Sequence, residues 1–349
     1  MKETTIYDIA KKLGISTATV SRALNGNEKN KKPTVKKATV LKILAAADKM
    51  GYQVNNHARS LRVKSNSKLI GLLLHKLNSQ FGINSVHSLE QYIHKYGYDL
   101  IISHSSENHE QEIVNAANLF QRRVDGLVVG LAADTKSMDH ILKYVEKGIP
   151  VVLFDRVRLD FPAVKIVLDN FKAAYDATTH LIEEGCKRIV HITGKPTSSL
   201  YVERLNGYKK ALEDNKIPYR PNLVLMRGLD AEAAPFLTQD ILSMSPLPDA
   251  VFAVNDLCAV LCMKLLKQAG VKIPGDMAIV GFNNDIISTL VEPNLTTINY
   301  SGTEIGTFAG KAIIDQINNP SMKNNFTVML NAELIVRASS KKNNHPVNR

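Results

Sequence analysis

Residues 5–26 read TIYDIAKKLGISTATVSRALNG, and this stretch decides how the N-terminal part of the chain folds. Thr5 is followed by an acid three residues later and by apolar side chains at helical spacing, which predicts a capped helix. Gly14 ends that helix, because glycine adopts the left-handed conformation of a helix end without steric cost. Ser16 can cap a second helix over residues 17–24. Two short helices joined by such a tight turn are typical of a helix-turn-helix, whose second helix can enter the major groove of DNA.

The start of the second helix carries side chains that can read base pairs. Thr17 offers a hydroxyl, Ala18 a methyl group that can meet the thymine methyl, and Arg22 a guanidinium that suits the edge of guanine. Many helical pairs with a short turn bind nothing, so an ordinary αα-hairpin remains the alternative at this point. The charge distribution favours the DNA-binding interpretation.

Positive charge is concentrated at the N-terminus. Residues 1–65 contain fourteen Lys or Arg and four Asp or Glu, a balance of +10 in a chain whose formal net charge is +11. The remaining residues together are therefore close to neutral. A basic head on a near-neutral body indicates a polyanionic partner for the head, whereas a solvated lysine-rich surface is the simpler alternative.

Four motifs near the N-terminus follow one another in the order of a known family. They are the helix-turn-helix run at 5–26, GYQVN at 51–55, ARSLR at 58–62 and LIGLL at 69–73. This part of the chain closely resembles the start of the LacI/GalR (lactose and galactose repressor) family. The resemblance implies a third helix over roughly 34–50, packed under the first two.

The resemblance also implies a short hinge helix near 55–62, which orders when two subunits sit on DNA. In the family this helix lies in the minor groove and inserts a leucine into the central base step, and Leu61 matches that position. Unstacking a base step is costly, but the resulting bend brings more protein surface into contact with the DNA. A helix-core role for Leu61 is the alternative, although the flanking sequence has too few apolar residues for a core. The basic loop at 27–37 is longer than is usual in the family, and its lysines could contact phosphate.

These observations divide the chain into three parts. We expect an all-α helix-turn-helix head over 1–54, a hinge helix and linker over 55–68, and a body for ligand binding and dimerisation over 69–340. Matching the family's motifs residue by residue gives these expected DNA contacts: Thr5, Tyr7, Ser16, Thr17, Ala18, Thr19, Ser21, Arg22, Asn25, Arg59, Leu61 and Arg62.

The body has a different pattern, in which apolar strands alternate with helices. We expect one set of strands at 69–74, 98–103, 126–130 and 150–154, and a second set at 165–168, 188–192, 250–254 and 278–282. Strand–helix alternation with short connections predicts parallel sheets covered by helices on both faces. Two such sets predict two similar lobes with a cleft between them, where ligands bind at the carboxyl ends of the strands.

The family resemblance extends over the body to about residue 338. It rests on runs such as RVDGL at 123–127, PVVLFDR at 150–156, RLNGY at 204–208 and VGFNND at 280–285. It implies an α/β body like a type I periplasmic sugar-binding protein, in which the chain crosses between the lobes three times. On this basis lobe 1 comprises about 69–168 and 299–330, and lobe 2 about 169–298 and 331–340.

The resemblance also places the effector contacts in this cleft. Carboxylate and amide acceptors, a guanidinium fork and a ring that can stack on a sugar face suit a polyol, so a sugar or sugar derivative is the expected effector. Singly, each residue has a plainer role in a cap, an ion pair or the core. Asparagine stands at 283, where an aspartate is commoner, and 227–230 lacks an aromatic residue that sugar-binding relatives often have. The matched positions are Phe81, Asp155, Arg204, Asn255 and Asn283, with Arg156 and Asp256 beside them.

Catalytic, metal and cofactor sites find little support. No Gly-x-Gly-x-x-Gly run or phosphate-loop lysine occurs, and no spacing joins a nucleophile, a base and an orienting group, so we expect neither an enzyme nor a cofactor. We also expect no metal. Cys258 and Cys262 have no nearby histidine to complete a zinc set, and an odd number of cysteines argues against a disulfide framework. The histidine pairs lack zinc spacing as well: His87 with His94, and His104 with His109.

The remaining alternative is a free solute-binding protein, which the body alone would suit. Such a protein would need an export signal and no basic head, whereas this N-terminus is basic and lacks the apolar core of a secretory signal. No apolar run approaches the ~20 residues that cross a membrane, so we expect a cytoplasmic protein. We expect a homodimeric repressor that reads a pseudo-palindromic operator with one head per half-site. Ligand in the cleft would either release DNA or favour it, through lobe closure and the hinge helices.

Overall fold

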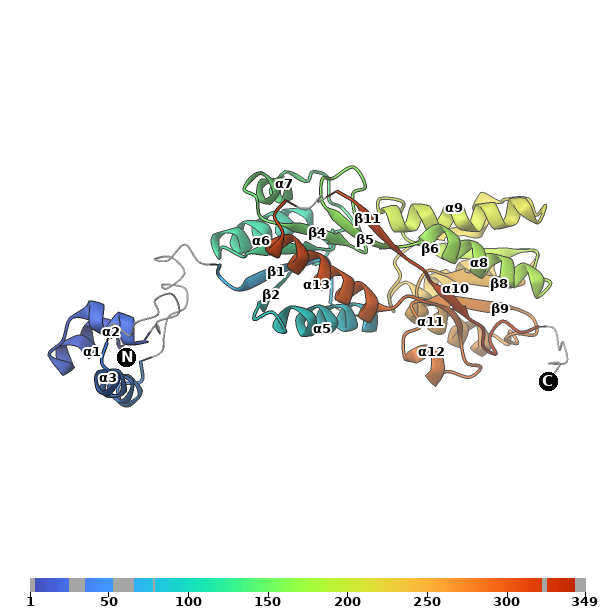
Figure 1. Cartoon of the computed structure of the whole chain (residues 1–349). Helices are drawn as coiled ribbons and strands as arrows, with labels where there is room; N and C mark the ends of the chain where they lie inside the picture. The colour runs from blue at the N-terminus through green and yellow to red at the C-terminus, as the bar shows by residue number, and fades with distance from the viewer. Residues whose placement is uncertain (1–3, 25–34, 53–65, 78, 322–324, 343–349) are drawn as a thin grey trace, which may run out of the picture. The chain divides into compact units, whose positions relative to one another are not determined.

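The computed structural model describes residues 4–24, 35–52, 66–77, 79–321 and 325–342. The chain divides into two compact units, Met1–Ser67 and Lys68–Arg349, drawn in Figure 1. We call them the head and the body. None of the helices in the described part of the chain combines the length and the apolar character that a membrane span requires.

The head is a three-helix unit, as its sequence pattern predicts. Ile9, Val20 and Ile43 come from different helices and are all fully buried, so each helix contributes to one small core. The third helix starts a little later than the resemblance implies. The expected hinge helix and most of the basic loop at 27–37 lie outside the described residues. The helices are α1 (Ile6–Leu13), α2 (Thr17–Leu24) and α3 (Lys37–Lys49).

The first lobe of the body is built on a six-stranded sheet in the order β11-β5-β4-β3-β1-β2. Its paired strands run parallel and are mostly buried, which explains their near-continuous apolar sequences. Helices α5 and α13 pack together on one face of this sheet, and α6 and α7 lie on the other (Figure 1). The elements are β1 (Leu69–Leu74), α5 (Gln80–His94), β2 (Asp99–His104), α6 (His109–Gln121), β3 (Gly126–Val129), α7 (Asp139–Glu146), β4 (Val151–Phe154), β5 (Val164–Leu168), α13 (Gly302–Asn318) and β11 (Thr327–Leu330).

The second lobe repeats this plan with the order β12-β10-β9-β8-β6-β7. Helices α8 and α9 cover one face of its sheet, and α10 and α11 cover the other, with the short α12 against α11. Only β12 runs antiparallel to its neighbour among the described pairs. The elements are α8 (Asn170–Glu183), β6 (Ile189–Thr193), α9 (Ser199–Asp214), η1 (Pro221–Leu223), β7 (Val224–Met226), α10 (Ala234–Leu242), β8 (Ala250–Ala253), α11 (Asp256–Gln268), β9 (Ala278–Phe282), α12 (Ile287–Leu290), β10 (Thr296–Asn299) and β12 (Glu333–Ile335).

The structure corrects one expected grouping of strands. The strand at 165–168 was expected to open the second set, but β5 pairs with β4 and β11 in the first sheet. The sequence pattern also missed β7, β10, β11 and β12. Three of these four strands lie at a sheet edge, where short, partly exposed strands carry a weak apolar signal.

The two lobes share an apolar core. One cluster of buried side chains extends from Ile70 in β1 through Tyr208 in α9 to Phe282 in β9. The chain also crosses between the sheets three times, before α8, before α13 and before β12, as the family resemblance implies. Side chains that follow the carboxyl ends of the parallel strands can therefore meet between the lobes.

Candidate functional site

The head holds its second helix in place through local caps. Thr5 and Asp8 form a capping box at the start of α1. Gly14 ends α1 with φ 64°, in the left-handed region, and its N–H donates to the Ala10 carbonyl. The Ser16 hydroxyl accepts the N–H of Thr19 at 3.2 Å and so caps α2. Each cap was predicted from the sequence.

The outer surface of the head carries the expected base-reading side chains. Ala18 and Arg22 are exposed on α2, Thr17 is half-buried, and Tyr7 of α1 is 64% exposed. Of the other expected DNA contacts, the Thr5, Ser16 and Thr19 side chains engage in cap interactions, and Ser21 is half-buried. The remaining ones lie outside the described residues: Asn25, Arg59, Leu61 and Arg62.

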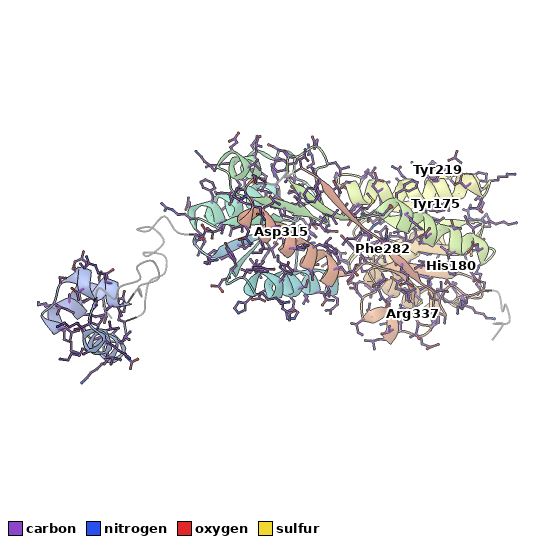
Figure 2. All side chains as sticks on the ribbon, in the orientation of Figure 1. Tyr175, His180, Tyr219, Phe282, Asp315 and Arg337 are labelled. Atoms are coloured by element: carbon purple, nitrogen blue, oxygen red, sulfur yellow. The ribbon has the colours of Figure 1, made fainter. Side chains whose placement is uncertain are left out.

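In the body, three of the seven expected effector residues lie around a central aromatic cluster. Phe81 stacks on Tyr300 with ring centroids 4.3 Å apart, and Tyr300 packs edge-on against Phe282. The guanidinium of Arg204 lies over the Phe282 ring at 3.5 Å. Phe282 lies at the end of the second lobe nearest the first lobe (Figure 2). The buried Asp155 completes the cluster by accepting the Tyr300 hydroxyl at 3.0 Å.

Arg204 is buried and firmly positioned. Its Nε donates to Asn170 Oδ1 at 2.8 Å, and its Nη1 donates to the Val254 carbonyl at 2.9 Å. Burial lowers the pKa of Arg204 to about 10, an effect that the nearby Asp155 partly opposes. The side chain is therefore still a cation at neutral pH. It is held by hydrogen bonds to two neutral acceptors, and no carboxylate among the described residues forms an ion pair with it.

A second charged group lies beside this cluster. Arg156 Nη1 donates to Glu107 Oε2 at 2.6 Å, and the Glu107 carboxylate also accepts the Ala133 N–H. Burial tends to raise the pKa of Glu107, but the charge of Arg156 and these hydrogen bonds hold it below its usual value. The pair lies close to His75, whose pKa is lowered mainly by burial.

A cavity of about 320 Å³ opens next to Arg156. Both lobes line it, since its wall includes residues after β3 and β4 and the start of α9. Arg156 Nε and Ser198 Oγ are buried there without a hydrogen-bond partner among the described residues. Buried polar atoms without partners favour a polar ligand or water at this position.

The three expected residues of the second sheet have separate roles. Asn255 caps α11 with its side-chain oxygen and donates to the Leu229 carbonyl. Asn283 follows β9 with φ 112°, a left-handed backbone conformation, and its side chain hydrogen-bonds Asp285. Asp256 is fully buried, and both of its oxygens are used within the lobe: Thr297 Oγ1 donates to one and the Asp285 N–H to the other. The geometry thus gives Asp256 a structural role.

Several residues of this site were not predicted from the sequence. Tyr300, Phe282 and Asn170 position the expected ones, and the Asp285 carboxylate accepts both the Asn283 side chain and the Phe81 backbone N–H. Burial raises the pKa of Asp285. Their positions could have identified two of them, because ligand sites lie at the ends of parallel strands. Phe282 is the last residue of β9, and Tyr300 follows the last residue of β10.

The buried carboxyl of Asp256 gives a testable pH dependence. Burial raises its pKa from 3.8 to about 7, so between these values the folded protein holds a proton that the unfolded chain releases. This contribution to stability is fully present below about pH 4 and is lost as the pH rises through about 7. One such group changes the free energy of unfolding by up to about 1.4 kcal/mol per pH unit.

We therefore expect Asp256→Asn to flatten the pH profile of stability between about pH 4 and 7. Asparagine can accept the Asp285 N–H and donate to Thr297, so the fold should tolerate it. Urea unfolding of both proteins at several pH values measures the difference in slope. Equal slopes would mean that this carboxyl stays ionised in the folded protein.

Fold and site together define a regulator with a helix-turn-helix head and a two-lobed, ligand-binding body. Family models agree with both parts: residues 5–55 match the bacterial regulatory proteins of the lacI family, and residues 178–340 match a periplasmic binding protein-like domain. The chain belongs to the LacI family of bacterial regulatory proteins. It is a DNA-binding transcription regulator, and members of the family are not enzymes.

Relatives align over nearly the whole chain. The HTH-type transcriptional repressor PurR of Photobacterium profundum is 30% identical over 97% of this chain and 98% of its own length. The ribose operon repressor of Halalkalibacterium halodurans is 31% identical over 97% of each chain. Among solved structures, the Lac repressor dimer bound to operator and the anti-inducer ONPF has a TM-score of 0.82 at 23% identity. The match covers 97% of this chain and 99% of that one, which supports the fold.

Proposed function

We propose that this regulator is a cytoplasmic repressor whose affinity for a pseudo-palindromic operator is controlled by a sugar or sugar derivative bound between the lobes. The observation that carries the proposal is the cluster of Phe81, Tyr300, Asp155 and Arg204, which joins a stacking ring, a carboxylate and a guanidinium at the strand ends. A ring with acceptors and a cationic fork around it suits the apolar face and the hydroxyls of a sugar. The ribose operon repressor is named for a sugar, in line with this choice.

The proposed domain organisation follows the same reasoning. The head comprises 1–54, the hinge and linker 55–68, and the two lobes share 69–340. Control requires that the lobes adopt two arrangements with different effector affinity, because a ligand shifts an equilibrium only by its preference for one state. The Asp285 carboxylate of the second lobe accepts the backbone N–H of Phe81 on α5 of the first lobe. Closure of the lobes would form or break this hydrogen bond.

A homodimer is part of the proposal, because a pseudo-palindromic operator needs two heads. The edge strand β2 and the neighbouring α5 expose apolar side chains that a partner could cover. Ile102 is 44% exposed on β2, and Ile83 is 50% exposed on α5. An uncovered apolar sheet edge favours self-association.

A ligand screen tests the effector. Pentoses, hexoses, disaccharides, their phosphates and purine bases are each added to the full-length protein, and the melting temperature Tm is recorded with and without operator DNA. A rise in Tm with a sugar or sugar phosphate supports the proposal. Stabilisation by purines alone would replace sugar with a flat, aromatic effector at the same site.

Operator recognition is tested at Arg22, after the operator has been selected from random DNA by binding to the full-length protein. We expect Arg22→Ala to weaken operator binding by about 1–3 kcal/mol and to relax the preference at one base pair of each half-site. Lys12→Ala on α1 is the control, because it removes one exposed charge. It should weaken binding to all DNA sequences by the same factor. Uniform weakening by Arg22→Ala would make Arg22 a phosphate contact instead.

A further inference from the structure

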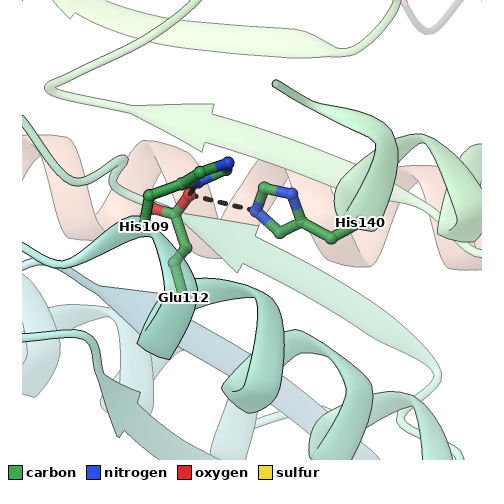
Figure 3. A group of neighbouring side chains, drawn as sticks. All are labelled: His109, Glu112 and His140. Atoms are coloured by element: carbon green, nitrogen blue, oxygen red, sulfur yellow. Dashed lines mark hydrogen bonds and ion pairs between the residues drawn. The ribbon is translucent and has the colours of Figure 1, made fainter. Parts of the chain in front are cut away.

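Two histidines and a glutamate meet on the first lobe, away from the effector cluster. His109 and Glu112 lie one turn apart at the start of α6, and His140 lies at the start of α7. Figure 3 shows the His140 imidazole joined to the Glu112 carboxylate by a hydrogen bond, with the His109 ring beside them. One donor atom from each residue lies within 4.8 Å of the other two. His109 is close to His104 in the sequence, whereas in the fold it lies next to His140.

The carboxylate of Glu112 is buried and held in a fixed orientation. Its Oε2 accepts the Ala132 N–H at 2.8 Å, and its Oε1 accepts the Thr135 hydroxyl at 2.9 Å and faces His140 Nε2 at 3.0 Å. The group is therefore a preoriented oxygen donor.

His109 supplies the second observation. Its Nδ1 is buried, lies 3.5 Å from Glu112 Oε1 and has no hydrogen-bond partner among the described residues. A buried imidazole nitrogen without a partner is costly unless something binds it. A cation placed between this nitrogen, Glu112 and His140 would satisfy it.

We propose that His109 Nδ1, Glu112 Oε1 and His140 Nε2 form a binding site for a divalent transition-metal ion, with Zn²⁺ as the best match. Zinc binds nitrogen at about 2.0–2.1 Å and carboxylate oxygen at about 2.0–2.2 Å, so tetrahedral ligands lie roughly 3.3 Å apart. Glu112 Oε1 lies 3.0 Å from His140 Nε2 and 3.5 Å from His109 Nδ1, which brackets that value, and the ligand atoms of the three residues all lie within 4.8 Å of one another. Two imidazoles and one carboxylate leave a fourth position for water.

The site also has the outer contacts that metal sites use. The Thr135 hydroxyl and the Ala132 N–H orient the carboxylate, as outer hydrogen bonds commonly orient metal ligands. The tautomer of His140 with its proton on Nε2 donates to Glu112 Oε1. Metal binding releases this proton to solvent, because the ligand nitrogen must be free to coordinate.

The location gives the metal a physical role. The ion would tie the start of α6 to the start of α7, two helices that pack on the same face of the first sheet. Ala132 and Thr135, which hold Glu112, also line the cavity beside Arg156. Zn²⁺ would therefore stiffen one wall of that cavity and raise the melting temperature of the body.

The test is Zn²⁺ binding to the metal-stripped, full-length protein, measured by competition with a chromophoric chelator and by Tm. We expect a Zn²⁺ site that raises Tm where Mg²⁺ does not. His109→Ala and His140→Ala should each lower Zn²⁺ affinity by more than 100-fold, beyond the ~10–100-fold that loss of an outer partner costs. Thr135→Val removes such an outer partner and should fall within that smaller range.

His87→Ala is the matched control, because it removes an exposed histidine from α5 of the same lobe. It should leave the affinity and the Tm shift unchanged. Equal Zn²⁺ binding by wild type, His109→Ala and His140→Ala would overturn the proposal and assign the metal to another place. Absence of Zn²⁺ binding, with both imidazoles titrating by NMR, would also overturn it and leave a proton-binding cluster only.

Discussion

Gly306→Ala should lower the free energy of unfolding of the body by about 3 kcal/mol, at the upper end of the usual cost of overpacking. Gly306 lies on α13 where that helix packs against α5. A Cβ atom added there would lie 2.1 Å from the Ser85 carbonyl oxygen and 2.2 Å from Ser88 Oγ. The first of these atoms belongs to the backbone, so a side-chain rotation cannot relieve the clash and the helices must separate.

The same change should weaken the response to effector. Phe81 lies at the start of α5, and Tyr300 lies just before α13, so separating these helices would disturb the ring stack between them. Denaturant unfolding and the ligand-induced shift in Tm measure the two effects. Gly275→Ala is the control, because its added Cβ would meet its nearest neighbour at an ordinary 3.6 Å. A stability loss no larger than that of the control would show that α5 and α13 can move apart without cost.

Local signals carried most of the prediction of the head. The Thr5–Asp8 capping box, Gly14 and Ser16 act over only a few residues, so the sequence alone determines them. The buried strands of the body can also be predicted from the sequence. For example, β1 is an uninterrupted apolar run and was predicted with its observed bounds. Edge strands such as β11 were not, because their pairing partners lie far away in the sequence.

Residues of the effector site could be predicted from the sequence only where they match a motif of the family. Tyr300 binds Asp155, a residue 145 positions earlier, and no local pattern connects the two. Asp256 was expected beside the matched effector positions, and its two carboxylate oxygens accept hydrogen bonds from Thr297 and Asp285 inside the second lobe. His109 and His140 belong to different helices, so only the packing of α6 on α7 shows that they converge.

Arg204→Met should lower the affinity for the effector by roughly 100-fold. A hydrogen bond to a charged group is worth about 1.5–3 kcal/mol, and 2.7 kcal/mol corresponds to about 100-fold in affinity. Two of the three guanidinium nitrogens are positioned by Asn170 and Val254, which aims the donors of the third in a fixed direction. Methionine retains the length and apolar character of the stem over Phe282 but has no N–H donor.

The substitution should also reduce stability, since the Val254 carbonyl and Asn170 Oδ1 each lose a buried donor at a cost of about 1–3 kcal/mol. The affinity is therefore measured directly, by calorimetry below the melting temperature, for the compound that raises Tm of the wild type in the screen. Arg220→Met removes an exposed arginine from the same lobe and should change neither quantity. If Arg204→Met lost stability but bound the effector as tightly as wild type, Arg204 would only hold the lobe together. The effector would then be recognised by Asp155, Asp285 and the aromatic rings without a contribution from Arg204.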